Sequence, residues 1–161
     1  MPIENATALS KQEQVIPGLP MRLKIPKIHV DANIESVGLT ANGAMDVSKG
    51  PSNAAWFEPG PRPGEIGSAV LAGHYGWKAG SVFDNLHKLR KGDRLHIEDD
   101  KGRITSFIVR KIRRYSPEAN ASAVFRSNDG KSHLNLITCE GVWNKTSRSY
   151  SKRLVVFADK E

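Results

Sequence analysis

The only cysteine of the chain, Cys139, closes an apolar run over residues 134–139. Leu, Ile and Thr favour strands and neither Gly nor Pro interrupts the run, so we expect a strand that ends at Glu140. Alternation along this strand places Ile137 and Cys139 on one face and Thr138 on the other. A thiol at the end of a rigid strand is well placed to act as a nucleophile. The competing interpretation is a buried structural thiol, which is what most free cysteines are.

A cysteine nucleophile needs a base or a cation nearby, because the thiolate is the reactive form. His74 is the strongest candidate, since it follows the short apolar run 68–72, which is typical of a buried strand. The small residues Ala72 and Gly73 leave space beside it. Sequence spacing alone does not bring His74 and Cys139 together, and a polar turn residue is the alternative. Weaker candidates lie on polar faces or before the cysteine strand: His29, His87, His96 and His133.

The elements that must position these residues are mostly strands. The chain has about eight short segments with strand-like alternation or apolar runs, separated by turn residues. The clearest are 21–25, 28–34, 68–72, 104–115, 134–139 and 154–158. This pattern predicts an all-β barrel or sandwich.

Helix is expected only in short pieces. Residues 53–57 predict a helical turn with Trp56 and Phe57 in the core. Phe83, Leu86 and Leu89 recur every third residue, which indicates a short helix or 3-10 turn. Long loops are expected over 58–67, 116–131 and 140–152, a length that usually marks functional or disordered segments.

The length and composition are typical of one globular domain. The chain has 161 residues, a net charge of +7 and a single cysteine. One cysteine excludes an internal disulfide. No window resembles a membrane span or a signal peptide. The excess positive charge fits an anionic partner such as a cell wall, lipid headgroups or nucleic acid.

Four motifs, in order along residues 21–158, carry a family resemblance. The run Asn135-Leu136-Ile137-Thr138-Cys139 resembles the TLxTC motif of sortases, with Asn in the first place. Leu71-Ala72-Gly73-His74 resembles the strand that ends in the sortase histidine. Residues 83–93 match F-x-x-L-x-x-L-x-x-G-D, and Arg153 precedes the last apolar strand. Together these motifs are similar to the sortase family, and their surroundings are closest to class F.

The resemblance implies a closed eight-stranded β-barrel with short helical or 3-10 turns, and a catalytic set of His74, Cys139 and Arg153. It implies a cysteine transpeptidase that cleaves an LPxTG-like sorting signal between Thr and Gly and passes the acyl group to a cell-wall or pilin amine. Ala72, Ile137 and Thr138 are the expected substrate-binding residues. Arg148 is the rival to Arg153, and Trp143 is a candidate lid or amine-site residue.

No cofactor is implied, and the acidic cluster Glu98-Asp99-Asp100 is interpreted as a solvated hairpin tip rather than a metal site. The expected organisation is a flexible lead over 1–20 and the catalytic barrel over 21–161. Residues 1–20 contain no signal anchor, so the chain is interpreted as the ectodomain of a membrane-tethered enzyme that works at the outer face of the cytoplasmic membrane. The expected partners are sorting-signal proteins and a cell-wall precursor amine.

Two other classes of function compete with this interpretation. The first is a cysteine hydrolase with the same three residues, because the chain does not specify whether an amine or water resolves the acyl-enzyme. The second is a non-catalytic barrel that binds nucleic acid through the basic residues of 101–114. Few aromatic residues interleave with those charges, so the basic run is better interpreted as the solvated face of a strand, and no nucleic-acid partner is expected.

Overall fold

The computed structural model describes residues 16–161, so most of the predicted lead over 1–20 lies outside the described residues. The elements are β1 (Pro20–Ile25), η1 (Pro26–Ile28), β2 (Val30–Val37), β3 (Ala54–Phe57), β4 (Gly67–Ala72), η2 (Leu86–Lys88), β5 (Arg94–Asp99), β6 (Ile104–Tyr115), α2 (Ser122–Phe125), β7 (Ser132–Asn144) and β8 (Ser149–Lys160). Among the described residues, no helix has both the length and the apolar character that a membrane span requires.

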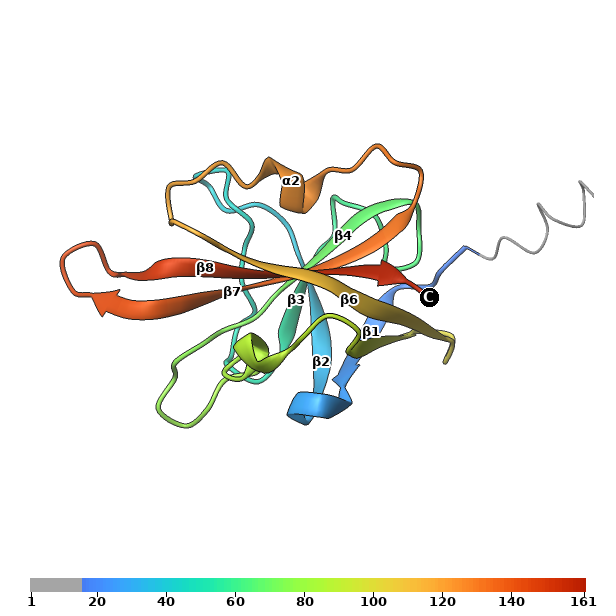
Figure 1. Ribbon diagram of the computed structural model, residues 1–161, viewed down its shortest axis with the longest axis horizontal. Helices are drawn as coiled ribbons and strands as arrows, with labels where there is room; N and C mark the ends of the chain where they lie inside the picture. The colour runs from blue at the N-terminus through green and yellow to red at the C-terminus, as the bar shows by residue number, and fades with distance from the viewer. Residues whose placement is uncertain (1–15) are drawn as a thin grey trace, which may run out of the picture.

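The eight strands close into a barrel in the order β1-β2-β3-β4-β7-β8-β6-β5, which confirms the predicted fold class (Figure 1). Most neighbours are antiparallel, but β2 pairs with β3 and β4 pairs with β7 in parallel. The parallel pair β4–β7 needs a long crossover, and residues 73–131 supply it with β5, β6 and α2. The crossover makes the end of β4 a neighbour of the cysteine strand.

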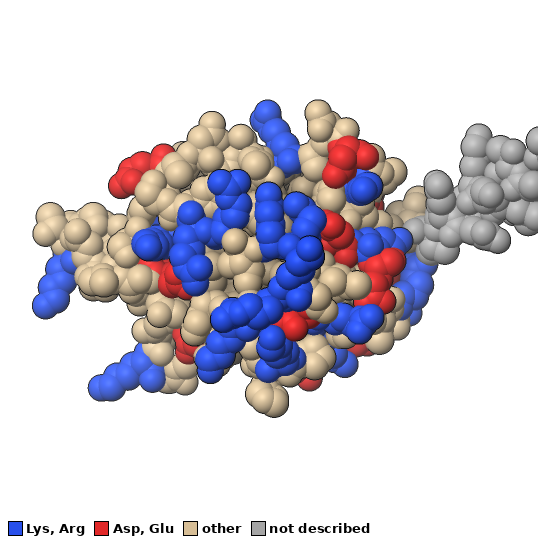
Figure 2. All heavy atoms as spheres, in the orientation of Figure 1, with Lys and Arg blue, Asp and Glu red and all other residues tan. Residues whose placement is uncertain are grey.

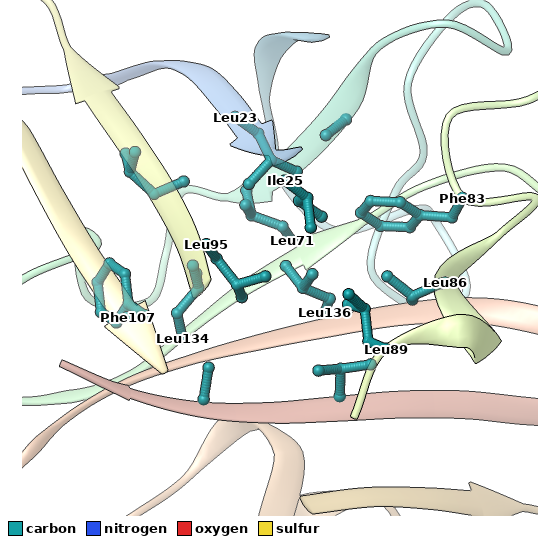
Figure 3. Packing of buried hydrophobic residues seen from close by; sticks show 14 of the residues in the cluster. Leu23, Ile25, Leu71, Phe83, Leu86, Leu89, Leu95, Phe107, Leu134 and Leu136 are labelled. Carbon is teal, nitrogen blue, oxygen red and sulfur yellow. The ribbon is translucent and has the colours of Figure 1, made fainter. Parts of the chain in front are cut away.

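Apolar side chains at alternate positions of the strands fill the barrel interior, together with side chains from η2 and its flanking residues. Figure 3 shows these side chains converging from β1, β4, β5, β6 and β7. Phe83, Leu86 and Leu89 are fully buried, which confirms the predicted 3-10 turn and its apolar stripe. Leu134 and Leu136 point into this core, as strand alternation predicts.

A second apolar cluster lies on the outer face of the sheet, under α2. It contains Val70, Val124, Val155 and Phe157, with Phe57 and Phe125 packed against it. The two phenylalanine rings meet edge to face, with centroids 5.3 Å apart. The predicted long connection 116–131 therefore includes a helical turn that covers part of the sheet.

Two local predictions are wrong. Within 53–57, Ala54–Phe57 forms the strand β3 rather than a helical turn, because this segment pairs with both β2 and β4 and tertiary pairing overrides local propensity. The segment 140–152 is not a long loop, and Cys139 does not end its strand. Gly141 adopts a left-handed φ of 91° within a bulge between Glu140 and Trp143, so β7 continues to Asn144.

In Figure 1 the extended parts of β7 and β8 project together beyond the barrel, at the left of the view. Ser151 Oγ accepts a hydrogen bond from the backbone N–H of Val142, which satisfies a donor that the bulge takes out of the ladder. Pairing then resumes between Trp143 and Tyr150. The result is a hairpin that overhangs the cysteine.

Candidate active site

Cys139, His74 and Arg153 form a row: Cys139 is on β7, Arg153 is on β8, and His74 follows the end of β4 by two residues. Cys139 pairs directly with Arg153 across β7 and β8, so the two side chains share a face. Ala72 pairs with Ile137 across β4 and β7, and the N–H of Gly73 continues that ladder by donating to the Ile137 carbonyl at 3.1 Å. His74 follows the last paired residue of β4, Ala72, by two positions, and Cys139 follows Ile137 by two positions. The side chains of all three residues line the same cleft.

Two hydrogen bonds, one to the carbonyl of Gly73 and one to the carbonyl of His74, hold the backbone at His74 in place. The Thr138 hydroxyl donates to the Gly73 carbonyl at 2.7 Å, and the N–H of Phe83 donates to the His74 carbonyl at 3.2 Å. A Cβ on Gly73 would lie 2.4 Å from the Phe83 ring, so only glycine fits beside this core residue. Thr138 is buried and faces away from Cys139, as alternation predicts, and its bonded hydroxyl indicates a positioning role.

The His74 ring is oriented by a backbone carbonyl. Nε2 lies 3.0 Å from the carbonyl oxygen of Ser48, which can only accept, so Nε2 carries a hydrogen. Nδ1 is the ring nitrogen that this contact leaves free. Trp77 packs against the other side of the ring with centroids 5.4 Å apart. This arrangement holds the imidazole in one tautomer and one orientation.

An open cleft of about 400 Å³ surrounds the row. Its apolar walls come from strand positions on the outer face of the sheet, from the loop before β3 and from α2. The cleft is lined by Met45, Val47, Ala72, Phe125, Ile137, Trp143 and Tyr150, together with His74, Cys139, Thr138, Arg148 and Arg153 among others. All six residues that the sequence assigned to the site, and the rival Arg148, therefore line one cleft.

Asn135, the departure from the sortase motif, holds α2 in place. Its side chain is buried, and Nδ2 donates to the carbonyl of Val124 at 2.7 Å. Val124 precedes Phe125, which lines the cleft. Asn135 thus connects the cysteine strand to one wall of the cleft, a contact that the sequence alone did not indicate.

Tyr150 joins the overhanging hairpin to the loop after His74. Its ring packs edge to face against Tyr75 and Trp143, with centroids 5.3 and 5.1 Å apart. Burial, and then the nearby Tyr75, Cys139 and Asp84 groups, raise the pKa of Tyr150, so its hydroxyl stays protonated at neutral pH. A Cβ on Gly76 would lie 2.1 Å from the Tyr150 hydroxyl oxygen, so the loop passes directly beneath the phenol.

Several residues that line the cleft were missed by sequence reasoning. Ser48 contacts His74 through its carbonyl, which carries no sequence signal. Tyr75 and Tyr150 carried a weak signal, because each is an aromatic residue within three positions of His74 or Arg153. Met45 and Phe125 come from segments distant in sequence, and only the fold brings them to the cleft.

His133 and the acidic hairpin tip have contacts that support the scaffold. His133 is buried with its ring nitrogens each 2.7 Å from a carboxylate oxygen, Nδ1 from Asp159 and Nε2 from Asp129. At the predicted hairpin tip, the Asp99 and Asp100 carboxylates accept the N–H groups of Gly18 and Leu19. These contacts give the two groups structural roles.

The basic residues of β6 gather on one face of the molecule, where Figure 2 shows a band of Lys and Arg. Two of them form ion pairs, Arg110 with Asp159 and Arg114 with Glu140. Lys111 lies 4.8 Å from the centroid of the Phe157 ring, over its face. This environment supports the interpretation of the run as a solvated strand face.

The cleft therefore brings a cysteine, a histidine and two arginines together on a closed barrel. The sequence matches the Sortase domain family over residues 23–161, so the chain belongs to the sortase family, a family of cysteine transpeptidases. A search of curated proteins returned no match.

Solved structures agree with the family. Sortase C-1 from Actinomyces oris superimposes with a TM-score of 0.69 at 26% identity, covering 88% of this chain and 74% of that one. Sortase C1 from Streptococcus agalactiae, in complex with MTSET, gives a TM-score of 0.69 at 26% identity, with 88% and 66% covered. Sortase A from Corynebacterium diphtheriae shares the fold, with a TM-score of 0.68 at 21% identity, covering 90% and 61%. The class F assignment stays a prediction.

Proposed function

We propose that this sortase cleaves an LPxTG-like sorting signal between Thr and Gly and transfers the acyl group to an amine of the cell wall or of a pilin. The observation that supports this proposal best is that His74, just after β4, lines one cleft with Cys139 of β7 and Arg153 of β8, which are direct ladder partners. Both substrates lie outside the cell, so we place the reaction at the extracellular face of the cytoplasmic membrane.

In the first step the Cys139 thiolate attacks the carbonyl carbon of the Thr–Gly bond. An S–C bond forms and the carbonyl electrons move to oxygen. Collapse of this intermediate breaks the C–N bond, and the leaving glycine amine takes a proton from His74 Nδ1. Because Nε2 is held by the Ser48 carbonyl, Nδ1 is the donor available for this transfer.

Arg153 is the group proposed to stabilise the oxyanion. It lies directly across the ladder from Cys139, and its guanidinium reaches back to the carbonyls of Tyr150 and Lys152 at 3.4 Å. A fixed cation next to developing negative charge is worth several kcal/mol of barrier in many enzymes. Arg148 lies in the turn of the hairpin, where its position depends on the loop, so Arg153 is preferred.

The apolar part of the cleft is the proposed binding surface for the sorting signal. Ala72 and Ile137 form its floor beside the catalytic row, and Met45 and Phe125 form walls. Burying apolar side chains of an extended peptide there is worth about 25 cal/mol per Å² of area removed from water. Thr138 supports this floor from the barrel side.

A peptide-library experiment tests the proposal. The protein is mixed with LPxTG-related peptides and its intact mass is measured; a sortase gains the acyl fragment on its only thiol and releases a glycine-led peptide. Cys139→Ala is expected to form no adduct. His74→Ala is expected to slow the reaction by about 10²–10⁴-fold. The matched control is His87→Ala, which removes an exposed histidine outside the cleft and should keep the wild-type rate.

The proposal fails if no library peptide forms an adduct, or if Cys139→Ala still cleaves at an appreciable rate. A cysteine hydrolase with the same three residues would form the same adduct, and it is distinguished by the fate of that adduct when amines are supplied.

A further inference from the structure

The cleft contains two arginines, and only one of them faces the thiol across the ladder. Arg148 lies at the tip of the β7–β8 hairpin, exposed, with a left-handed φ of 52°. None of the ion pairs formed within residues 16–161 includes Arg148. It therefore offers an unneutralised cation to whatever enters the cleft from the hairpin side.

Between Arg148 and the catalytic row the hairpin presents two aromatic rings. Passing from the tip toward the thiol, the ladder pairs Asn144 with Ser149, Trp143 with Tyr150, and Cys139 with Arg153. Trp143 is 49% exposed and lines the cleft. Its edge-to-face packing on Tyr150 fixes the ring, and aromatic faces attract both aliphatic chains and ammonium groups.

We propose that this hairpin surface binds the acceptor. We propose further that it selects an acceptor in which the carbon bonded to the amine also carries a free carboxylate, as at either end of diaminopimelate. This inference rests on the transpeptidase function proposed above. The Arg148 guanidinium pairs with the carboxylate through its planar fork. The rings of Trp143 and Tyr150 hold the aliphatic chain, and the amine reaches the thioester on Cys139.

The chemistry of this step balances with the residues present. The neutral acceptor nitrogen attacks the thioester carbon, and an N–C bond forms. The C–S bond breaks and its electron pair returns to Cys139 Sγ. The proton lost by the nitrogen goes to His74 Nδ1, which restores the starting imidazolium and thiolate.

A carboxylate requirement would also give the reaction a direction. The peptide released in the first step begins with a glycine amine whose neighbouring carbonyl is an amide, and that amine could reverse the reaction. This leaving peptide has no free carboxylate on the carbon that carries its amine. A site built around Arg148 therefore binds the true acceptor in preference to the leaving peptide.

The test compares two acceptors on the acyl-enzyme, meso-diaminopimelate and its diamide. Amidation lowers the amine pKa and by itself makes the diamide the better nucleophile at neutral pH, so a preference for the carboxylate form requires a binding contact. We expect kcat/KM for transfer to be at least about tenfold higher with meso-diaminopimelate, the worth of one charge-assisted hydrogen bond.

Arg148→Gln should remove that preference, lowering kcat/KM for meso-diaminopimelate about tenfold or more through KM, while the diamide rate changes little. Lys145→Gln is the matched control, since it removes the same charge from the same turn but lies outside the cleft. It should keep the preference.

Equal use of the two acceptors by the wild type would overturn the inference, as would loss of the preference in Lys145→Gln. An Arg148→Gln protein that no longer forms the acyl-enzyme would also overturn it, because Arg148 would then act in the first step. If the wild type forms no acyl-enzyme with any sorting peptide, the proposed function fails instead, and this is seen before an acceptor is added.

Discussion

The hydrogen bond from Thr138 to the Gly73 carbonyl is expected to support both the fold and the placement of His74. Thr138→Val keeps the shape and volume of the side chain but removes the donor. Thr138 is 4% exposed and its Oγ1 lies 2.7 Å from the carbonyl oxygen. Valine therefore leaves that carbonyl without its donor inside the protein.

The expected magnitude follows from the chemistry of the bond. A neutral hydrogen bond contributes about 0.5–1.5 kcal/mol net, and a buried unsatisfied carbonyl costs about 1–3 kcal/mol. The two terms overlap, and valine gains some apolar burial, so we expect a loss of about 2 kcal/mol. For a protein of this size that lowers Tm by about 4–8 °C.

Activity should fall further than stability alone explains. Gly73 precedes His74, and small misplacements of a catalytic group can lower rates by about 10²-fold. We expect the acylation rate of Thr138→Val to fall about tenfold or more at a temperature where the protein is fully folded. Thr138→Ser, which keeps the hydroxyl, is the control.

Thermal unfolding followed by circular dichroism and single-turnover acylation measure the two effects. A Thr138→Val protein with wild-type Tm and wild-type acylation would refute the reasoning, and so would a Thr138→Ser protein as impaired as the valine variant. A loss of Tm with an unchanged rate would show that the bond stabilises the fold without positioning His74.

Three further predictions follow from single contacts. Arg153→Gln should slow acylation about 10²–10³-fold, whereas Lys152→Gln, an exposed neighbour on the same strand, should not; the reverse ranking in single-turnover assays would contradict the oxyanion assignment. Gly76→Ala should lower Tm and activity, because φ is +85° and the new Cβ overlaps the Tyr150 hydroxyl; a variant with normal Tm and rate would contradict this packing. Burial opposes ionisation of Asp99, but hydrogen bonds from backbone N–H groups including that of Gly18 lower its pKa to about 2. Its stabilising effect is therefore complete above about pH 4 and lost as the pH falls toward 2, so Asp99→Asn should flatten the acid limb of a Tm–pH curve, and an unchanged limb would exclude this role.

The barrel was predictable because it depends on patterns that act over short distances. The expectation that His74, Cys139 and Arg153 share one cleft came from the motif resemblance. Alternation in 134–139 fixed the faces of Ile137, Thr138 and Cys139, and burial agrees with each. The apolar run of β4 and the apolar stripe of Phe83 and Leu86 could likewise be predicted from the sequence. The motif resemblance then ordered these pieces into one fold.

Both failures involve strand pairing that overrides the local residue pattern. Residues 54–57 carry no strong strand pattern, yet they complete the barrel between β2 and β4. Gly141 is a typical strand terminator, but here its left-handed conformation makes a bulge and the hairpin resumes. No local signal distinguishes these outcomes.

The cleft walls were the least predictable part of the site. The Ser48 carbonyl on His74 and the Asn135 contact to Val124 join segments 26 and 11 residues apart. Backbone groups and a single amide carry these contacts, so they leave no residue pattern that a sequence analysis can detect. These contacts show how the fold orients His74 and the cleft wall, which sequence analysis could name as candidates but could not position.

The most direct test of the central claim is the partition of the acyl-enzyme between amine and water. The protein is incubated with a labelled LPxTG peptide and increasing concentrations of glycine-based, diaminopimelate-type or lysine-containing acceptors. A transpeptidase predicts a ligated product that grows with acceptor concentration at the expense of the free acid. If the product is entirely free acid with every acceptor, at every concentration, the protein is a hydrolase and the claim is contradicted.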